Sequence, residues 1–272
     1  MNRYLALLYT IFLSFWRNRG LIMQMSRREV IGRYRGSVMG LLWSFFNPIL
    51  MLAVYTFVFG VVFRARWGTG EESKADFAII LFSGMIVHSL FAECINRAPN
   101  LILSNVNYVK KVVFPLEILP WVTMGSTLFH TVISVLVLLI FFFGINFYLN
   151  WTVVFLPALL IPLVVFTMGI SWFLASTGVF LRDVGQTTGI ITTVMMFLSS
   201  VFYPVSTLPE TYRLLLHINP LTFIIEQTRD IIIWGRLPNW QGLGIYLIIS
   251  LIVAGLGFVW FQKTRKGFAD VL

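Results

Sequence analysis

The sequence predicts an all-α integral membrane protein with six transmembrane helices, and three observations lead to that prediction. Only 11% of the 272 residues are charged and 58% are hydrophobic, whereas ordinary soluble domains carry about 25% charged residues. Long apolar runs recur along the chain, and lipid can cover such surfaces where water cannot. Arginines and lysines gather at the ends of these runs, which is the pattern of a membrane protein.

Six apolar runs are long enough, or nearly long enough, to cross a membrane as helices, which takes about 20 residues each. These runs cover residues 40–63, 77–95, 119–144, 151–181, 187–203 and 243–261, and the fifth is the shortest. We therefore predict one six-span transmembrane domain over residues 40–261, followed by a cytoplasmic tail over residues 262–272.

A seventh apolar segment, residues 221–234, is too short and too charged to cross. It contains Glu226, Arg229 and Asp230, and three prolines interrupt the chain ahead of it. Short, interrupted apolar segments are typical of re-entrant structure. We predict a re-entrant helical hairpin at about residues 204–234, between spans five and six, in which these three charges pair locally at helical spacing.

The first 39 residues are predicted to form amphipathic helices on the cytoplasmic surface of the membrane. Residues 4–16 are apolar but too short to cross, and no small-residue cleavage site follows them, so a signal peptide is not expected. A dense cationic cluster then precedes the first span. It comprises Arg27, Arg28, Arg33 and Arg35. A helix with such a polar face lies along the membrane surface among anionic headgroups.

The distribution of basic residues predicts the orientation. With six spans, both termini lie on one side of the membrane. That side receives fourteen of the 20 lysines and arginines, and the opposite side receives six. Because cytoplasmic loops carry the excess of positive charge, both termini are expected in the cytoplasm.

The sequence offers no pattern for chemistry of its own. No Gly-Lys dipeptide occurs, so the phosphate-binding pattern GxxxxGK[ST] is absent. The single cysteine, Cys94, and the widely spaced His88, His130 and His217 suggest neither a metal site nor a catalytic set. The net charge of +9 does not indicate nucleic-acid binding, because the basic residues flank apolar runs. Such a protein is a channel, or a subunit that a partner drives.

Four motifs in sequence order point to a family. They are SRREVIGRYRGSVMGLLWSFFNPIL (residues 26–50), VKKVVFPLEILP (109–120), LRDVGQ (181–186) and NPLTFIIEQTRDIIIWGRLPNW (219–240). Together with the span count, they resemble the membrane subunit of ABC-type polysaccharide exporters. These permeases export O-antigen, capsule or teichoic-acid polymers. The resemblance runs from about residue 20 to the C-terminus.

The resemblance implies a homodimeric permease in the bacterial inner membrane, paired with two copies of a soluble ABC ATPase. It implies no cofactor in this chain, since ATP and magnesium would bind to the ATPase. It also implies that the cationic helix and the loop after span two receive force from the ATPase. The coupling residues would be Arg27, Arg28, Arg33, Arg35, Asn100, Lys110 and Lys111. Arg182 and Asp183 would lie on the cytoplasmic turn between spans four and five.

The resemblance further places the polymer path between the two subunits, lined by spans one and five. Sugar rings stack on aromatic side chains, and their hydroxyls need hydrogen-bond partners. The candidate lining residues are Phe45, Tyr55, Thr56 and Phe59 in span one, and Thr188, Thr192, Met195 and Ser199 in span five. The alternative is that these small polar side chains pack helices together.

The expected function is therefore that of a permease subunit, and not of an enzyme. It would move a lipid-linked polysaccharide, with O-antigen as the first candidate, out of the cytoplasm under the power of a separate ATPase. Three alternatives remain open. They are a related permease for drugs or lipids, a membrane-embedded glycan-processing enzyme, and a self-sufficient channel. For Arg182 and Asp183, a local ion pair and a tie that holds the turn during gating are both open.

Overall fold

The protein is helical throughout the part that the computed structural model describes, which is residues 3–62, 67, 74–110 and 114–272. The helices are α1 (Arg3–Arg33), α2 (Trp43–Tyr55), α3 (Lys74–Arg97), α4 (Val106–Lys110), α5 (Leu119–Asn146), α6 (Leu156–Phe180), α7 (Val184–Phe197), α8 (Glu210–Ile218), α9 (Pro220–Ile232), α10 (Trp240–Thr264) and α11 (Phe268–Val271). A π-helical stretch, Thr56–Val62, continues α2. The all-α prediction is confirmed for these residues.

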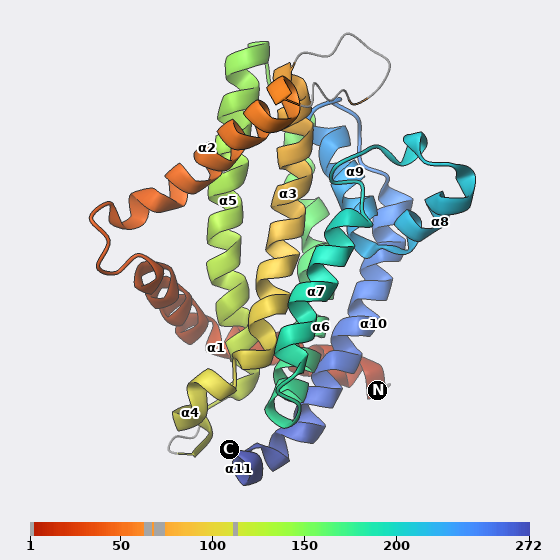
Figure 1. Cartoon of the computed structure of the whole chain (residues 1–272). Coiled ribbons are helices and arrows are strands. Elements are labelled where there is room, and N and C mark those ends of the chain that lie inside the picture. Colours follow the sequence, from red (N-terminus) through yellow and green to blue (C-terminus); the bar gives the residue numbers. More distant parts are fainter. Residues whose placement is uncertain (1–2, 63–66, 68–73, 111–113) are drawn as a thin grey trace.

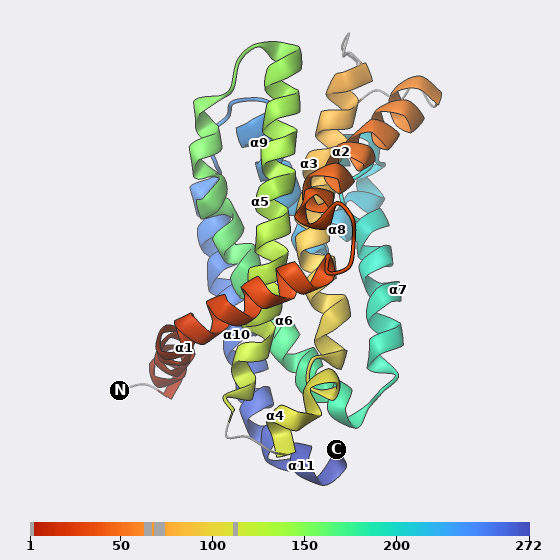
Figure 2. The same ribbon diagram turned by 90° about the vertical axis from the view of Figure 1, so that its left-hand side faces the viewer.

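The long helices form a bundle with two distinct ends (Figure 1). One end, which we call the terminal end, carries both chain termini with α4 and α11, and α1 lies crosswise near it (Figure 2). The other, the hairpin end, carries α8 and α9. The chain therefore begins and ends at the same end of the bundle.

Within the described residues, five helical stretches are long and apolar enough to cross a membrane. They are Gly40–Phe59, Phe77–Asn100, Leu116–Asn146, Trp151–Phe180 and Trp240–Val271, and they correspond to five of the six predicted spans. The remaining one, predicted over residues 187–203, is the 14-residue helix α7, which ends at Phe197. In Figure 1, α7 rises only partway toward the hairpin end.

Helix α7 ends early because side chains, in place of main-chain amides, donate hydrogen bonds to the carbonyl groups at its end. The Asn219 amide donates hydrogen bonds to the carbonyls of Met195 and Leu198, at 2.8 and 2.9 Å. The Tyr203 hydroxyl donates to the Phe197 carbonyl. A helix end that lacks water needs such partners. The chain can therefore leave the helix without exposing unpaired main chain.

Helix α3 forms the centre of the bundle. In its most apolar 18-residue window, 78% of the residues are buried, against 17% for the Gly40–Phe59 stretch. Helices α5, α7 and α9 all contact α3, and Figure 1 shows α5 and α7 on opposite sides of it. Helix α2, by contrast, leaves Phe45, Phe46 and Ile49 exposed. That surface must be covered by lipid or by another chain.

Glycines allow α6 and α10 to pack at close range. A Cβ atom at Gly257 would overlap the main chain of Gly169, and a Cβ at Gly169 would lie 2.6 Å from the Ala254 nitrogen. Small residues at helix contacts are the usual way in which membrane helices gain packing energy. This pair fixes α10 against the bundle.

Arg229 of α9 ties the hairpin end to the bundle. Its guanidinium donates to the main-chain carbonyls of Ile80 (3.0 Å), Ser200 (2.6 Å) and Val201 (2.9 Å). It also lies over the Trp67 ring, 4.1 Å from the ring centroid. Only 1% of Arg229 is exposed. The side chain thus joins α9 to α3 and to the turn that follows α7.

The predicted local pairing of the three charges in α9 is wrong. Arg229 forms no ion pair with Glu226 within 4 Å, because its donors are committed to the distant carbonyls. Asp230 lies 3.6 Å from Arg236 and accepts a hydrogen bond from Gln227 at 2.9 Å. Helical spacing made the local pairs possible, but burial of Arg229 favoured carbonyl partners across the bundle.

Replacing Arg229 with methionine should destabilise the protein by about 3 kcal/mol, because buried carbonyls that lose their donors cost about 1–3 kcal/mol each. Thermal unfolding of the purified protein in detergent measures the effect. Arg236→Met is the matched control, since the Arg236 side chain is 72% exposed. A melting temperature for Arg229→Met equal to that of the control would show that the three bonds do not hold this end together.

Candidate coupling interface and substrate path

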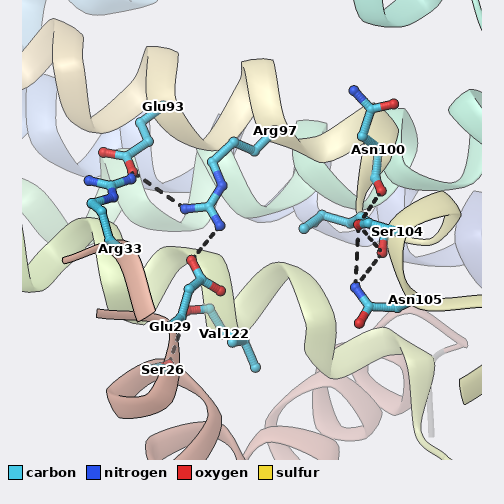
Figure 3. A network of polar contacts seen from close by, with 10 residues as sticks. Ser26, Glu29, Arg33, Glu93, Arg97, Asn100, Ser104, Asn105 and Val122 are labelled. Atoms are coloured by element: carbon cyan, nitrogen blue, oxygen red, sulfur yellow. Dashed lines mark hydrogen bonds and ion pairs between the residues drawn. The ribbon is translucent and has the colours of Figure 1, made fainter. Parts of the chain in front are cut away.

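Four alternating charges connect α1 to α3 (Figure 3). Glu93 pairs with Arg33 of α1 and lies 3.4 Å from Arg97. Arg97 in turn lies 2.5 Å from Glu29 of α1. On each helix an acid precedes an arginine by four residues, so both side chains project from one face. We call this set, Glu29, Arg33, Glu93 and Arg97, the charge chain.

The charge chain sets the position of α1 more than it stabilises the fold. Its side chains are between 23% and 39% exposed, and exposed ion pairs contribute about 0–1 kcal/mol each. Of its four members, the sequence predicted only Arg33 as functional. The shared spacing of Glu29–Arg33 and Glu93–Arg97 was the available signal.

Helix α1 is also fixed by packing against α5. Ile22, Ser26 and Val30 are buried along one face, and the Ser26 hydroxyl donates to the Val122 carbonyl at 3.0 Å. A Cβ at Gly125 would lie 2.5 Å from the Ser26 hydroxyl oxygen, so glycine makes room for it. The remaining predicted arginines of this helix and of the turn after it are exposed. They are Arg27, Arg28 and Arg35.

The segment after α3, which the resemblance predicts to receive force from the ATPase, is a series of short helical turns. Two 3₁₀ turns, Ala98–Asn100 and Leu103–Asn105, precede the five-residue α4. The Ser104 hydroxyl donates to the Asn100 carbonyl at 2.7 Å, and the Asn105 amide donates to the Leu101 carbonyl at 2.8 Å (Figure 3). These side chains compete with the helical pattern and break it.

This segment presents polar groups at the terminal end while its other side packs on α6. Asn100 and Lys110 are exposed, and Lys111 lies outside the described residues. A Cβ at Gly178 of α6 would overlap the main chain of Pro99. The segment is therefore held against the bundle, and movement of its exposed side would be passed to α3 and α6.

Glu117 forms a second polar anchor, which the sequence analysis missed. Its carboxylate accepts from Arg265, just after α10, at 2.8 Å, and from the Ser14 hydroxyl of α1 at 3.4 Å. Its main-chain carbonyl accepts from the Trp172 indole of α6 at 2.9 Å. Three separate helices thus meet at one residue at the start of α5.

Arg182 and Asp183 lie on the turn between α6 and α7, at the terminal end. Both side chains are exposed, and among the described residues they form no ion pair with each other or with a third group. The Asp183 carbonyl accepts from the Gln186 and Thr187 amides, so the main chain alone starts α7. Their role in gating stays a prediction.

The polar stripe of α7 faces α3 within this chain. Thr188, Thr192 and Ser199 are buried, and Met195 is half-buried. The Thr192 hydroxyl donates to the Asn96 side chain at 3.2 Å. In this conformation the stripe packs α7 against α3, and its place in a polymer path stays a prediction.

Apolar side chains make up much of the exposed surface of α7, beside the exposed Gln186, Thr187 and Thr193. Ile190, Ile191, Val194 and Phe197 are exposed along it. This surface is where lipid or a second subunit would contact the helix.

The aromatic residues of span one join a ring cluster that reaches the end of α7. Phe59 contacts Tyr55, Phe77 and Phe202, with centroid distances between 5.9 and 6.4 Å. Phe202 stacks on Phe197 of α7 at 5.2 Å. The cluster therefore links the two helices predicted to line the path.

The other two residues predicted in span one lie outside this cluster. Phe45 is exposed on α2, and the Thr56 hydroxyl donates to the Leu52 carbonyl of its own helix at 2.8 Å. Their role in a path stays a prediction.

Comparison with known proteins accounts for almost the whole chain. Residues 20–233 match the family described as ABC-2 type transporter. The chain is 27% identical over 259 residues to the O-antigen export system permease protein RfbA of Myxococcus xanthus, covering 94% of this chain and 97% of that one. A Klebsiella pneumoniae protein of the same name is 27% identical, covering 93% and 95%. The polysialic acid transport protein KpsM of Escherichia coli is 21% identical, covering 88% and 91%. Since the family match includes α2 to α9, this multi-pass membrane protein is an ABC-2 permease and belongs to the ABC-2 type transporter family.

Proposed function

We propose that this permease exports a lipid-linked polysaccharide, in the first place O-antigen, from the cytoplasm across the bacterial inner membrane. The observation that carries the proposal is the similarity to O-antigen export permeases over nearly the full length of both chains. The similarity to a polysialic acid transport protein points to the same class of cargo.

The proposed topology has six crossings with both termini in the cytoplasm. Five are the long apolar helices, and α7 with the turn after it makes the sixth. Helices α8 and α9 form the re-entrant hairpin on the outer side, and α1 lies on the cytoplasmic surface as the interface helix. The position of both termini at one end of the bundle supports this arrangement (Figure 1).

The proposed assembly is a homodimer with two copies of a separate ABC ATPase, which binds ATP and magnesium. The poorly buried α2 leaves an apolar face that a second copy can cover. The ATPase would contact exposed residues of α1, of the segment after α3 and of the turn between α6 and α7, among them Arg27, Arg28, Asn100, Lys110 and Arg182.

Force would pass from that surface to α3 through the charge chain and the segment after α3. Helix α3 contacts both α2 and α7, so its displacement would change how the two path helices meet at the ring cluster. This chain performs no covalent step. Directional transport requires contacts that differ between the ATP-bound and ATP-free states of the complex.

Deleting the gene should cause lipid-linked polymer to accumulate inside the cell, and the tagged chain should co-purify with a soluble ATPase. Glycolipid analysis of membranes from the deletion strain, with and without the restored gene, gives the first result. ATP hydrolysis by the purified chain alone would contradict the proposal that a separate ATPase supplies the energy. Normal surface polymer in the deletion strain would remove polysaccharide as the cargo.

Neutralising the charge chain should reduce export with little loss of folding. We expect Glu29→Gln and Arg97→Gln each to slow export, and the double variant to be no slower than the worse single one, because both remove the same contact. The coupling energy should be about 0.5–1 kcal/mol, as for exposed ion pairs. Polymer export at matched protein levels measures it, with the exposed Lys263→Gln as control. If the export losses of the two single variants add strictly in the double variant, Glu29 and Arg97 act independently and the prediction fails.

Replacing both Tyr55 and Phe59 with alanine should reduce export about fivefold or more while membrane insertion persists. Each removed ring contact contributes about 1 kcal/mol beyond its buried area. Surface polymer per inserted permease is the measurement, and Phe143→Ala, on an exposed face of α5, is the control. Unchanged export in the double variant would remove these rings from the path.

A further inference from the structure

A groove of about 270 Å³ lies between α2, α3 and α5. The hydrogen-bonding side chains on its wall include Ser44, Asn47, Ser89, His130, Thr131 and Ser134, and Tyr55, one of the candidate path residues, lines it too. Helix α5 lies on the opposite side of α3 from α7 (Figure 1), so the groove is on the far flank of α3 from the polar stripe of α7. It is lined by residues of three membrane-spanning segments of a single chain.

Several polar groups in this groove have no partner within the described chain. The side chains of Asn47, Ser89 and Ser134 form no hydrogen bond there, and the buried Nε2 atom of His130 has none either. Polar groups at membrane depth are costly unless they are hydrogen-bonded. The groove therefore suits a molecule that brings hydroxyl or ester oxygens into it.

The groove is charged at one end and apolar at its rim. Arg33 and Glu93 of the charge chain line it. A guanidinium has five N–H donors, and a single ion pair with Glu93 leaves others for an anion. Ile49 on α2, with Val132 and Leu136 on α5, is exposed beside the groove. An amphiphile with an anionic head and hydrocarbon chains matches this arrangement.

We propose that the groove binds one membrane phospholipid whose headgroup carries hydroxyls, such as phosphatidylglycerol. Its phosphate accepts from Arg33, which is the geometry that arginine favours for phosphate. Its glycerol oxygens meet Asn47, Ser89 and Ser134, and its acyl chains lie along the exposed face of α5 at Val132 and Leu136. The groove is open on one side, so a headgroup can sit in its volume of about 270 Å³ while the acyl chains extend out of it. Because Arg33 also belongs to the charge chain, the bound lipid touches the contact that positions α1.

Native mass spectrometry of the full-length permease in detergent tests the proposal by titration with dioleoyl phosphatidylglycerol and with phosphate-free dioleoylglycerol. The wild type should bind the phospholipid about tenfold more tightly than it binds dioleoylglycerol, and this factor corresponds to about 1.4 kcal/mol. Ser134→Leu, which fills the groove, and Arg33→Gln, which removes the phosphate donor, should each abolish that preference.

Two variants control for damage to the fold. Glu93→Gln breaks the same ion pair as Arg33→Gln but leaves the guanidinium in place, so it should retain phospholipid binding. Thr193→Leu introduces leucine on an exposed face of α7, away from the groove, and should bind as the wild type does. Loss of binding in Glu93→Gln would show that the ion pair matters and not the phosphate contact, and would overturn the proposal.

Equal phospholipid binding in the wild type, Ser134→Leu and Arg33→Gln would also overturn it. A second arm uses lipid-linked sugar diphosphate as the probe. If Ser134→Leu blocks that probe and export but not phosphatidylglycerol, the groove belongs to the cargo, and the phospholipid assignment fails while the proposed export function stands. If Ser134→Leu instead loses phosphatidylglycerol binding and keeps a normal affinity for the glycan probe, the result supports the assignment of the groove to a phospholipid.

Discussion

The fold depends on keeping every main-chain carbonyl paired where helices break inside a membrane. Helix α7 stops after 14 residues, and water is not there to solvate its last turn. Asn219 and Arg229 replace the missing partners, from segments 21 to 29 residues further along the chain. Arg229 also bonds to α3, so α3, α9 and the end of α7 form one unit.

The polar contacts that join helices at the terminal end are individually weaker. There α1 is joined to α3 by ion pairs between partly exposed side chains, each contributing about 0–1 kcal/mol. These ion pairs are individually weaker attachments than the buried bonds of Arg229, and α1 is held in addition by its packing on α5 through Ile22, Ser26 and Val30. In the proposed mechanism, a push on the terminal end would move α1 first, and α3, which contacts both α2 and α7, would carry the displacement toward them.

Properties that depend on local sequence could be predicted, and those that depend on distant partners could not. Five spans followed from apolar runs, and the family followed from four motifs in order. The end of α7 was placed too late because its partner Asn219 is remote in sequence. Arg229 was assigned neighbours in its own helix, whereas one of its partners, Ile80, is 149 residues away. Arg33 was predicted as a coupling residue within the cationic cluster, but its partner Glu93, 60 residues distant, could not be assigned to it.

The orientation of α7 constrains how a polymer path could open. Its hydroxyl stripe faces α3, and the side that a second subunit would meet carries Ile190, Ile191 and Val194. These three side chains offer sugars no hydrogen bonds. If Thr188 and Thr192 line the path during export, α7 must turn about its axis. The turn would break the hydrogen bond from the Thr192 hydroxyl to Asn96 (3.2 Å) and the one between the Thr192 carbonyl and His88 (2.9 Å). Breaking these two bonds costs less than breaking the bonds that Arg229 forms. The ring cluster at the end of α7 then becomes the pivot, because Phe202 keeps the end of α7 attached to Phe59 while the rest of the helix rotates.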